Sequence, residues 1–145
     1  MTTKDVQKNL VSTMRNWQQV ENSTVALTGQ VMEKTKNPIV RLIMEIIQRD
    51  SQMHYNVQEW IADSLEGKTV SLTPEEIGEV WSMIEKHIEI EKKSVEMAEQ
   101  AIEALKGKFM VLQTYLLNYL LADEKKHEDL LQGLESIKKK MHPYG

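Results

Sequence analysis

The chain has 145 residues, of which 41% are hydrophobic and 28% charged, so we expect one globular domain spanning residues 1–145. Because the sequence contains no cysteine, disulfides, zinc–thiolate sites, iron–sulfur clusters and thiol catalysis are excluded for this chain. The formal net charge of −4 argues against nucleic acid as a partner, since phosphate binding calls for a basic patch. No stretch approaches the ~20 apolar residues of a membrane span, and no apolar signal segment follows Met1, so we expect a cytoplasmic protein without membrane contact.

Glycine and proline divide the chain into long segments with helical periodicity. Pro38 suits the first turn of a helix, and Gly67 and Gly107 suit the positions just after one. Thr73-Pro74-Glu75-Glu76 is a strong helix start, with threonine as the N-cap, proline at the first helical position and glutamate three residues after the cap. No strand-like alternation competes with this interpretation. The four predicted helices are about Asp5 to Thr35, Pro38 to Glu66, Pro74 to Leu105 and Phe109 to Met141.

Each predicted helix carries an apolar stripe with alternating spacings of three and four residues, which is typical of a four-helix bundle. The ends of the stripes are apolar: they include Leu10, Met14, Trp17 and Val31 in the first helix, Val40 and Ile47 in the second, Val80 in the third, and Met110 and Leu120 in the fourth. Near the midpoint of every helix, however, the stripe becomes polar. If the helices lie side by side, these residues form one layer at the centre of the bundle. The polar residues are Glu21, then Ser51 and His54, then His87 and Glu91, and finally Glu124 and His127.

This central layer predicts a metal site. Buried carboxylates without partners cost several kcal/mol each, and a divalent cation removes that cost. Glu124-x-x-His127 places a carboxylate and an imidazole one turn apart on one face, a spacing used for metal sites inside bundles. Taken alone, this motif is more often a solvated helix face, and a single polar residue on a seam is more often a register device. It is the coincidence on all four helices that favours metal binding.

At this point the chain resembles the ferritin-like proteins, and among them the rubrerythrin-like di-iron carboxylate proteins. The resemblance covers about Trp17 to Leu134. It rests on two segments: Val20-Glu21 through Asn37-Pro38 to Asp50-Ser51-Gln52-Met53-His54, and Glu91-Lys92-Lys93-Ser94 through Asp123-Glu124-Lys125-Lys126-His127. It implies an all-α, ferritin-like four-helix bundle. It also implies that Glu21, His54, Glu91, Glu124 and His127 hold the metal. His87, one turn before Glu91, is an additional candidate ligand that the family pattern lacks.

The sequence departs from the family pattern at the second helix. Where the pattern has a glutamate that bridges two metals, this chain has Ser51, and the adjacent Asp50 lies 100° around the helix. Thr28 stands where many members have a tyrosine. The site therefore fits two metals with a solvent bridge, a mixed pair or a single ion. The family joins its second and third helices by a lengthwise crossover, whereas the short connection after Glu66 also fits an antiparallel turn, and the sequence leaves both open.

The function implied by the resemblance is redox chemistry at an iron centre. We expect a di-iron or iron–manganese site, with zinc also compatible, that reacts with O2 or peroxide as an oxidase, ferroxidase or peroxide reductase. Without cysteines for a rubredoxin segment, the chain needs an external electron donor. A homo-oligomer is compatible with the sequence. The alternative is a helical bundle without catalysis, serving as a metal-binding or structural interaction protein that has lost the full di-iron site, and Ser51 favours it.

Overall fold

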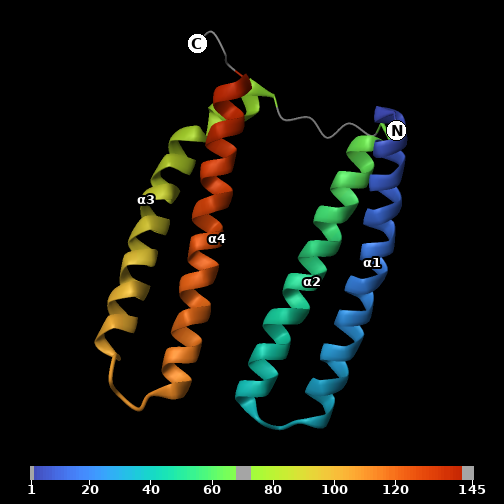
Figure 1. The fold of residues 1–145 in the computed structure, drawn as a ribbon. Coiled ribbons are helices and arrows are strands. Elements are labelled where there is room, and N and C mark those ends of the chain that lie inside the picture. Colours follow the sequence, from blue (N-terminus) through green and yellow to red (C-terminus); the bar gives the residue numbers. More distant parts are fainter. Residues whose placement is uncertain (1, 68–72, 142–145) are drawn as a thin grey trace. The chain divides into compact units, whose positions relative to one another are not determined.

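The computed structural model describes residues 2–67 and 73–141 of the chain, the side chain of residue 141 excepted. The described residues form four long helices and contain no strand, so the predicted all-α class and the four helices of the predicted bundle are confirmed. The predicted segment at residues 68–72 and the tail at residues 142–145 lie outside the described residues. None of the described helices is long and apolar enough to cross a membrane. The helices in chain order are α1 (Thr3–Lys34), α2 (Pro38–Leu65), α3 (Pro74–Ala104) and α4 (Val111–Met141) (Figure 1).

The start of α3 is the one that the sequence specifies most strongly. The Thr73 side chain accepts a hydrogen bond from the backbone N–H of Glu76, and the Glu76 side chain reaches back to the backbone N–H of Thr73. This reciprocal capping satisfies two N–H groups that would otherwise lack partners at a helix end. At the start of α2, the Asn37 side chain accepts hydrogen bonds from the backbone N–H groups of Ile39 and Val40, and Pro38 occupies the first helical position.

Two helix ends differ slightly from the sequence prediction. The sequence predicted a first helix from about Asp5, whereas the helix begins at Thr3. The reason is that Thr2 is the N-cap and forms a capping box with Asp5. The last helix begins at Val111 rather than near Phe109. The turn before it contains Gly107 with φ of 75°, a left-handed conformation that glycine adopts without steric penalty.

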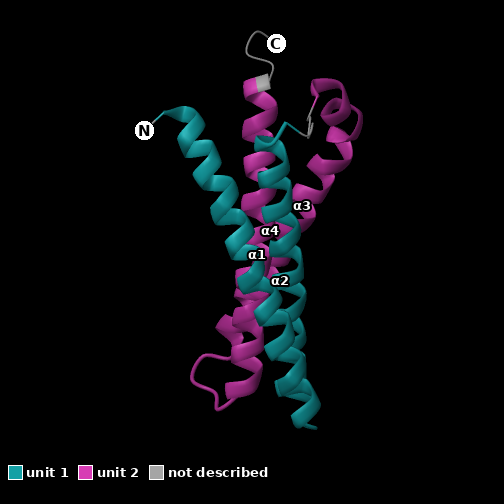
Figure 2. Cartoon of the chain, turned by 90° about the vertical axis from the view of Figure 1, so that its right-hand side faces the viewer, with its two compact units in different colours: residues 1–71 teal, residues 72–145 magenta. Residues whose placement is uncertain are grey.

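The helices pack in pairs, as two helical hairpins. One hairpin is α1 against α2, and the other is α3 against α4. Each belongs to a compact unit, residues 1–71 and residues 72–145, coloured separately in Figure 2. The connection between α2 and α3 includes residues that are not described, so the structure does not decide between a crossover and an antiparallel turn. The single domain over residues 1–145 stays a prediction.

The interior of each hairpin is a narrow seam, and in the first hairpin most of its buried residues are polar. In the α1–α2 hairpin, five of the seven buried residues are polar, and in the described residues no side chain is below 2% exposed. The seam of this hairpin contains Met14, Gln18, Glu21, Thr28, Ser51, Gln58 and Ala62. The buried residues of α3 are Ile77, Ile88, Glu91, Val95 and Ala98. A single seam between two helices is therefore the whole core of each unit.

Many apolar residues that the sequence assigned to the core stripes lie exposed instead. Trp17, for example, is 49% exposed, and Leu120 is 47% exposed. Each hairpin buries the line along which its own two helices meet, so stripe residues to the side of that line stay outside this seam. The affected stripe residues are Leu10, Trp17, Val31, Val40, Ile47, Val80, Met110 and Leu120.

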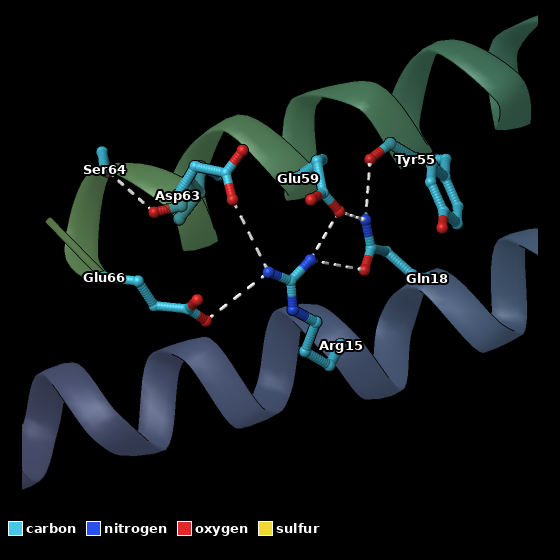
Figure 3. A network of polar contacts seen from close by, with 8 residues as sticks. Arg15, Gln18, Tyr55, Glu59, Asp63, Ser64 and Glu66 are labelled. Atoms are coloured by element: carbon cyan, nitrogen blue, oxygen red, sulfur yellow. Dashed lines mark hydrogen bonds and ion pairs between the residues drawn. The ribbon is translucent and has the colours of Figure 1, made fainter. Parts of the chain in front are cut away.

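An ion-pair network joins the two helices of the first hairpin (Figure 3). Arg15 of α1 pairs with Glu59 and, at 3.7 Å, with Asp63 on α2, and at 3.5 Å with Glu66, which directly follows α2. Gln18, one turn after Arg15, donates a hydrogen bond of 2.8 Å to the same Glu59 carboxylate. One cation facing three carboxylates on successive turns sets the register of α1 against α2. Sequence analysis did not single out this network.

Candidate metal site

Three side chains of the α3–α4 hairpin form a cluster with metal-ligand chemistry. One ligand atom each from Glu91, Glu124 and His127 lies within 4.8 Å of the others. The Glu91 side chain is 8% exposed, whereas those of Glu124 and His127 are 26% and 40% exposed. Glu124 and His127 reach the same point because they are one turn apart on α4, and Glu91 faces them from the middle of α3. The structure thus brings together three of the six predicted ligands.

The two nitrogens of His127 face different carboxylates. Nδ1 lies 3.5 Å from Glu91 Oε2 and 3.9 Å from Glu124 Oε2, on the side of the cluster. Nε2 lies 3.3 Å from Asp123 Oδ2, one turn away on the same helix. A carboxylate on the second nitrogen orients a ligating imidazole and makes it more basic. Sequence analysis did not assign this role to Asp123, although its spacing of four residues from His127 was the signal that points to it.

His87 contacts the cluster from the preceding turn of α3. Its Nε2 lies 2.9 Å from Glu91 Oε1, and its side chain is 56% exposed. A pocket of about 480 Å³ opens beside these groups and is lined by His87, Glu91, His127, Leu130 and Leu131. The cluster is therefore accessible from one side, with two imidazoles at its mouth.

The buried carboxylate of Glu91 carries an unsatisfied oxygen. Its Oε2 is enclosed, and no described group donates a hydrogen bond to it. A hydrogen bond from Glu124, with His127 and His87 nearby, lowers the pKa of Glu91, and the same hydrogen bond, burial and the Glu91 charge raise the pKa of Glu124. A divalent cation that binds to these two carboxylates would release the proton that the raised pKa of Glu124 favours.

The first hairpin holds the remaining two predicted ligands. The Glu21 side chain is 7% exposed, its Oε1 lies 3.6 Å from His54 Nδ1, and its Oε2 has no hydrogen-bond partner among the described residues. Ser51 is buried on the same seam, and together with Glu21 it lines a pocket of about 300 Å³. Asp50 does not line this pocket. The α1–α2 hairpin therefore presents one buried carboxylate and one imidazole, and it has a serine hydroxyl where a second carboxylate would complete the set.

The six predicted ligands thus fall into two groups, Glu21 with His54 and His87 with Glu91, Glu124 and His127. Compared with models of known protein families, with curated proteins and with solved structures, the chain has no match. What stands from the structure is an all-α chain with a carboxylate–imidazole cluster that has the chemistry of a metal site. The ferritin-like assignment stays a prediction from the sequence.

Proposed function

We propose that this protein binds a divalent transition metal through Glu91, Glu124 and His127, with His87 beside them. The observation that carries the proposal is the Glu91 carboxylate, which is buried with an oxygen that no described group satisfies, next to a second carboxylate and an imidazole. A polar atom buried without a partner is costly, and a cation bound to it converts that cost into binding. Two carboxylates and one or two imidazoles suit iron, manganese or zinc.

The chemistry we propose for the site is that of a di-iron or iron–manganese carboxylate centre. When bound, such metals supply redox reactivity toward O2 or peroxide. The residues of the chain then hold and neutralise the metal: Glu91 and Glu124 as carboxylate ligands, His127 as an imidazole oriented by Asp123. The resemblance assigns Glu21 and His54 to the same centre. Reducing equivalents come from an external donor, since the chain has no cysteine to hold a redox cluster.

Metal binding is tested first, by metal analysis and titration of the purified protein. Glu91→Gln removes the buried charge while keeping the side-chain shape, so it should lower the metal affinity by about tenfold or more. Glu96→Gln, at an exposed position of the same helix, is the matched control and should leave the affinity unchanged. A Glu91→Gln protein that binds iron, manganese and zinc as tightly as the parent would show that the cluster is not a metal site.

The redox function is tested separately. The protein is loaded with iron(II) without oxygen and then mixed with O2, and the oxidation of iron and the consumption of O2 are followed. We expect oxidation faster than that of the same iron(II) in buffer, and loss of this rate in Glu91→Gln. Iron that binds but oxidises no faster than in buffer would remove the oxidoreductase proposal and leave metal binding intact.

The second candidate function is a non-catalytic bundle that binds metal or a protein partner. Ser51 is the observation that favours it, because it leaves Glu21 as the one buried carboxylate of the first hairpin. The two tests above separate the candidates, since only the catalytic one predicts accelerated oxidation.

A further inference from the structure

In the α3–α4 hairpin, the candidate metal ligands all lie on one side of the position that a cation would occupy. Glu91, Glu124 and His127 approach a cation from the seam, and the pocket of about 480 Å³ leaves the opposite side open. His87 and His127 lie at that mouth with side chains 56% and 40% exposed. Iron and manganese take more ligands than the three or four that this hairpin offers. The remaining ligands must approach from outside the hairpin or come from solvent.

The surface around this opening is apolar. Met83, Ile90 and Met97 stand seven residues apart on α3 and are 68%, 57% and 61% exposed. On α4, Leu130 is 67% exposed and Leu120 is 47% exposed. Apolar residues repeated at this spacing form the contact line of a helix that packs on another helix. An apolar face of this kind on a protein surface marks a contact with a partner.

We propose that a second copy of the chain completes the metal centre, with the α3–α4 hairpins of two copies facing each other across a twofold axis and holding metal between them. This inference rests on the proposed metal-binding function and adds the source of the missing ligands. In this arrangement each copy contributes Glu91, Glu124 and His127 to a shared pair of ions.

The charges of the ligands favour this occupant. Two copies of the cluster bring four carboxylates and two imidazoles, and four carboxylates neutralise two divalent cations. Glu21 and His54 of the first hairpin would add only one carboxylate, because Ser51 occupies the position one turn before His54. Three carboxylates would leave one positive charge of a metal pair uncompensated. The self-complementary set is therefore the one that balances the charge.

The shape of the face is also self-complementary. Leu130 is exposed and lines the same pocket as His87. This pocket lies toward the N-terminal half of α3. On the other side, a groove of about 340 Å³ reaches Glu124 and is lined in part by the small residues Ser94, Ala98 and Ala101. A twofold axis perpendicular to the helices at the level of the cluster relates two copies that run in opposite directions. The Leu130 side of one copy then faces the small-residue groove of the other. The axis therefore places Leu130 of each copy against the small-residue groove of the other copy.

The test measures molar mass and metal content together, on the full chain. Sedimentation or light scattering is run on metal-free protein and on protein titrated with iron(II) without oxygen, with zinc(II) as a redox-inactive probe. We expect metal to convert monomers to dimers that hold two ions per two chains. Leu130→Glu places a charge in the proposed contact and should weaken both dimerisation and metal binding by about tenfold or more. Leu27→Glu, equally exposed on α1, is the matched control and should change neither.

A cross-link provides a second measurement that does not depend on affinity. Since the chain has no cysteine, Leu130→Cys combined with Ala98→Cys introduces the only two thiols. Within one hairpin these positions lie on opposite sides of the cluster, so a disulfide between them joins two chains. We expect oxidation of the metal-loaded variant to give a covalent dimer at high yield, and Leu27→Cys combined with Ala98→Cys to give none.

The outcomes separate this inference from the function on which it rests. Protein that binds metal as a monomer would overturn the second copy as the partner and leave the metal site standing. The same conclusion would follow if each monomer bound two ions and Glu21→Ala abolished this binding. A dimer in which Leu130→Glu has no effect would also overturn it. Failure of every metal to bind would overturn the proposed function itself, and the inference with it.

Discussion

His87 Nε2 lies 2.9 Å from Glu91 Oε1, one helical turn along α3, so that the exposed imidazole contacts the one carboxylate of the cluster that is buried. This contact fixes one oxygen of Glu91 and leaves the other, Oε2, directed to the side of Glu124 and His127. Removal of His87 should therefore weaken metal binding, either through a lost ligand or through a carboxylate that is no longer held in place.

For His87→Ala we expect a loss of metal affinity of about tenfold or more, measured by competition with a chelating dye. His87→Gln retains a hydrogen-bond donor near Glu91 and separates the two roles. Affinity restored by glutamine assigns His87 to holding Glu91, and affinity lost in both variants assigns it to the metal. Parent-like stoichiometry and affinity in His87→Ala would place the residue outside the site.

Metal removal should lower the thermal stability of the fold. A ligand present at about 100 times its dissociation constant stabilises the native state by about 2.7 kcal/mol. For a chain of this length, this corresponds to a melting temperature lower by roughly 5–10 °C after chelation. The comparison is made by circular dichroism on protein shown to contain metal, before and after dialysis against chelator. An unchanged melting temperature would contradict a metal that binds the folded state.

The stability of the metal-free protein should depend on pH through Glu124. Its pKa is raised in the folded state by the hydrogen bond to Glu91, by burial and by the Glu91 charge. Because the pKa of Glu124 is raised above its ordinary value of 4.5 in the folded state, its contribution to the free energy of unfolding is fully present below that ordinary value. This contribution is lost as the pH rises through the raised pKa. Glu91 has a lowered pKa, so its own contribution has the opposite sign and is lost as the pH falls.

The measurement is urea unfolding of metal-free protein at a series of pH values. Glu124→Gln should lack the loss of stability just above the usual carboxyl range, and Glu96→Gln should retain it. Because many carboxylates titrate together, the difference between variant and parent is the quantity that matters. A parallel pH dependence in parent and Glu124→Gln would contradict the raised pKa of Glu124.

Ser51→Glu should change the metal stoichiometry. Ser51 is buried on the α1–α2 seam, three residues before His54, and it lines a pocket of about 300 Å³ together with Glu21. A glutamate here gives the first hairpin a second carboxylate beside Glu21 and His54, so the variant should bind one more iron per chain than the parent and react faster with O2. Overpacking works against it, at about 1–3 kcal/mol, so iron is counted per folded chain, with helicity checked by circular dichroism. A parent that already binds two irons and oxidises them as fast would refute this account of Ser51.

Two buried glutamines on the first hairpin give a prediction independent of metal. Gln58 is 4% exposed and its Oε1 has no hydrogen-bond partner within residues 2–67 and 73–141, whereas Gln18, 3% exposed, donates to Glu59 and to the backbone carbonyl of Tyr55. Gln58→Leu should raise the free energy of unfolding by about 1 kcal/mol, because it removes an unsatisfied group. Gln18→Leu should lower it by a similar amount. Equal losses in both variants would show that Gln58 is satisfied.

The helices could be predicted closely because their ends are set by local chemistry. The capping box of Thr73 and Glu76, and the pairing of Asn37 with Pro38, act within a few residues of one another and are visible in the sequence. The contacts of His127 with Glu124 and Asp123 are equally local, since both carboxylates lie about one turn before it on α4. Asp123 was missed only because its segment is so rich in charge that one more carboxylate carried no signal.

The network around Arg15 could not be predicted in the same way. Arg15 and Glu59 are distant in sequence, and their pairing depends on the register in which α1 meets α2. The same holds for the exposure of Trp17 and Leu120, which the periodicity placed in a core. Periodicity fixes the direction of a side chain around its own helix, but burial depends on how many neighbouring helices lie on that side.

By itself, the sequence determined the four helices, the depth at which each becomes polar, and the six residues with metal-ligand chemistry. The tertiary structure decided which of them meet: Glu21 with His54 in one hairpin, and Glu91 with Glu124, His127 and His87 in the other. It also decided that one Glu91 oxygen is buried without a donor. The reason is that hydrophobic periodicity and capping are properties of single helices, whereas contacts and burial arise only when two helices pack in a definite register.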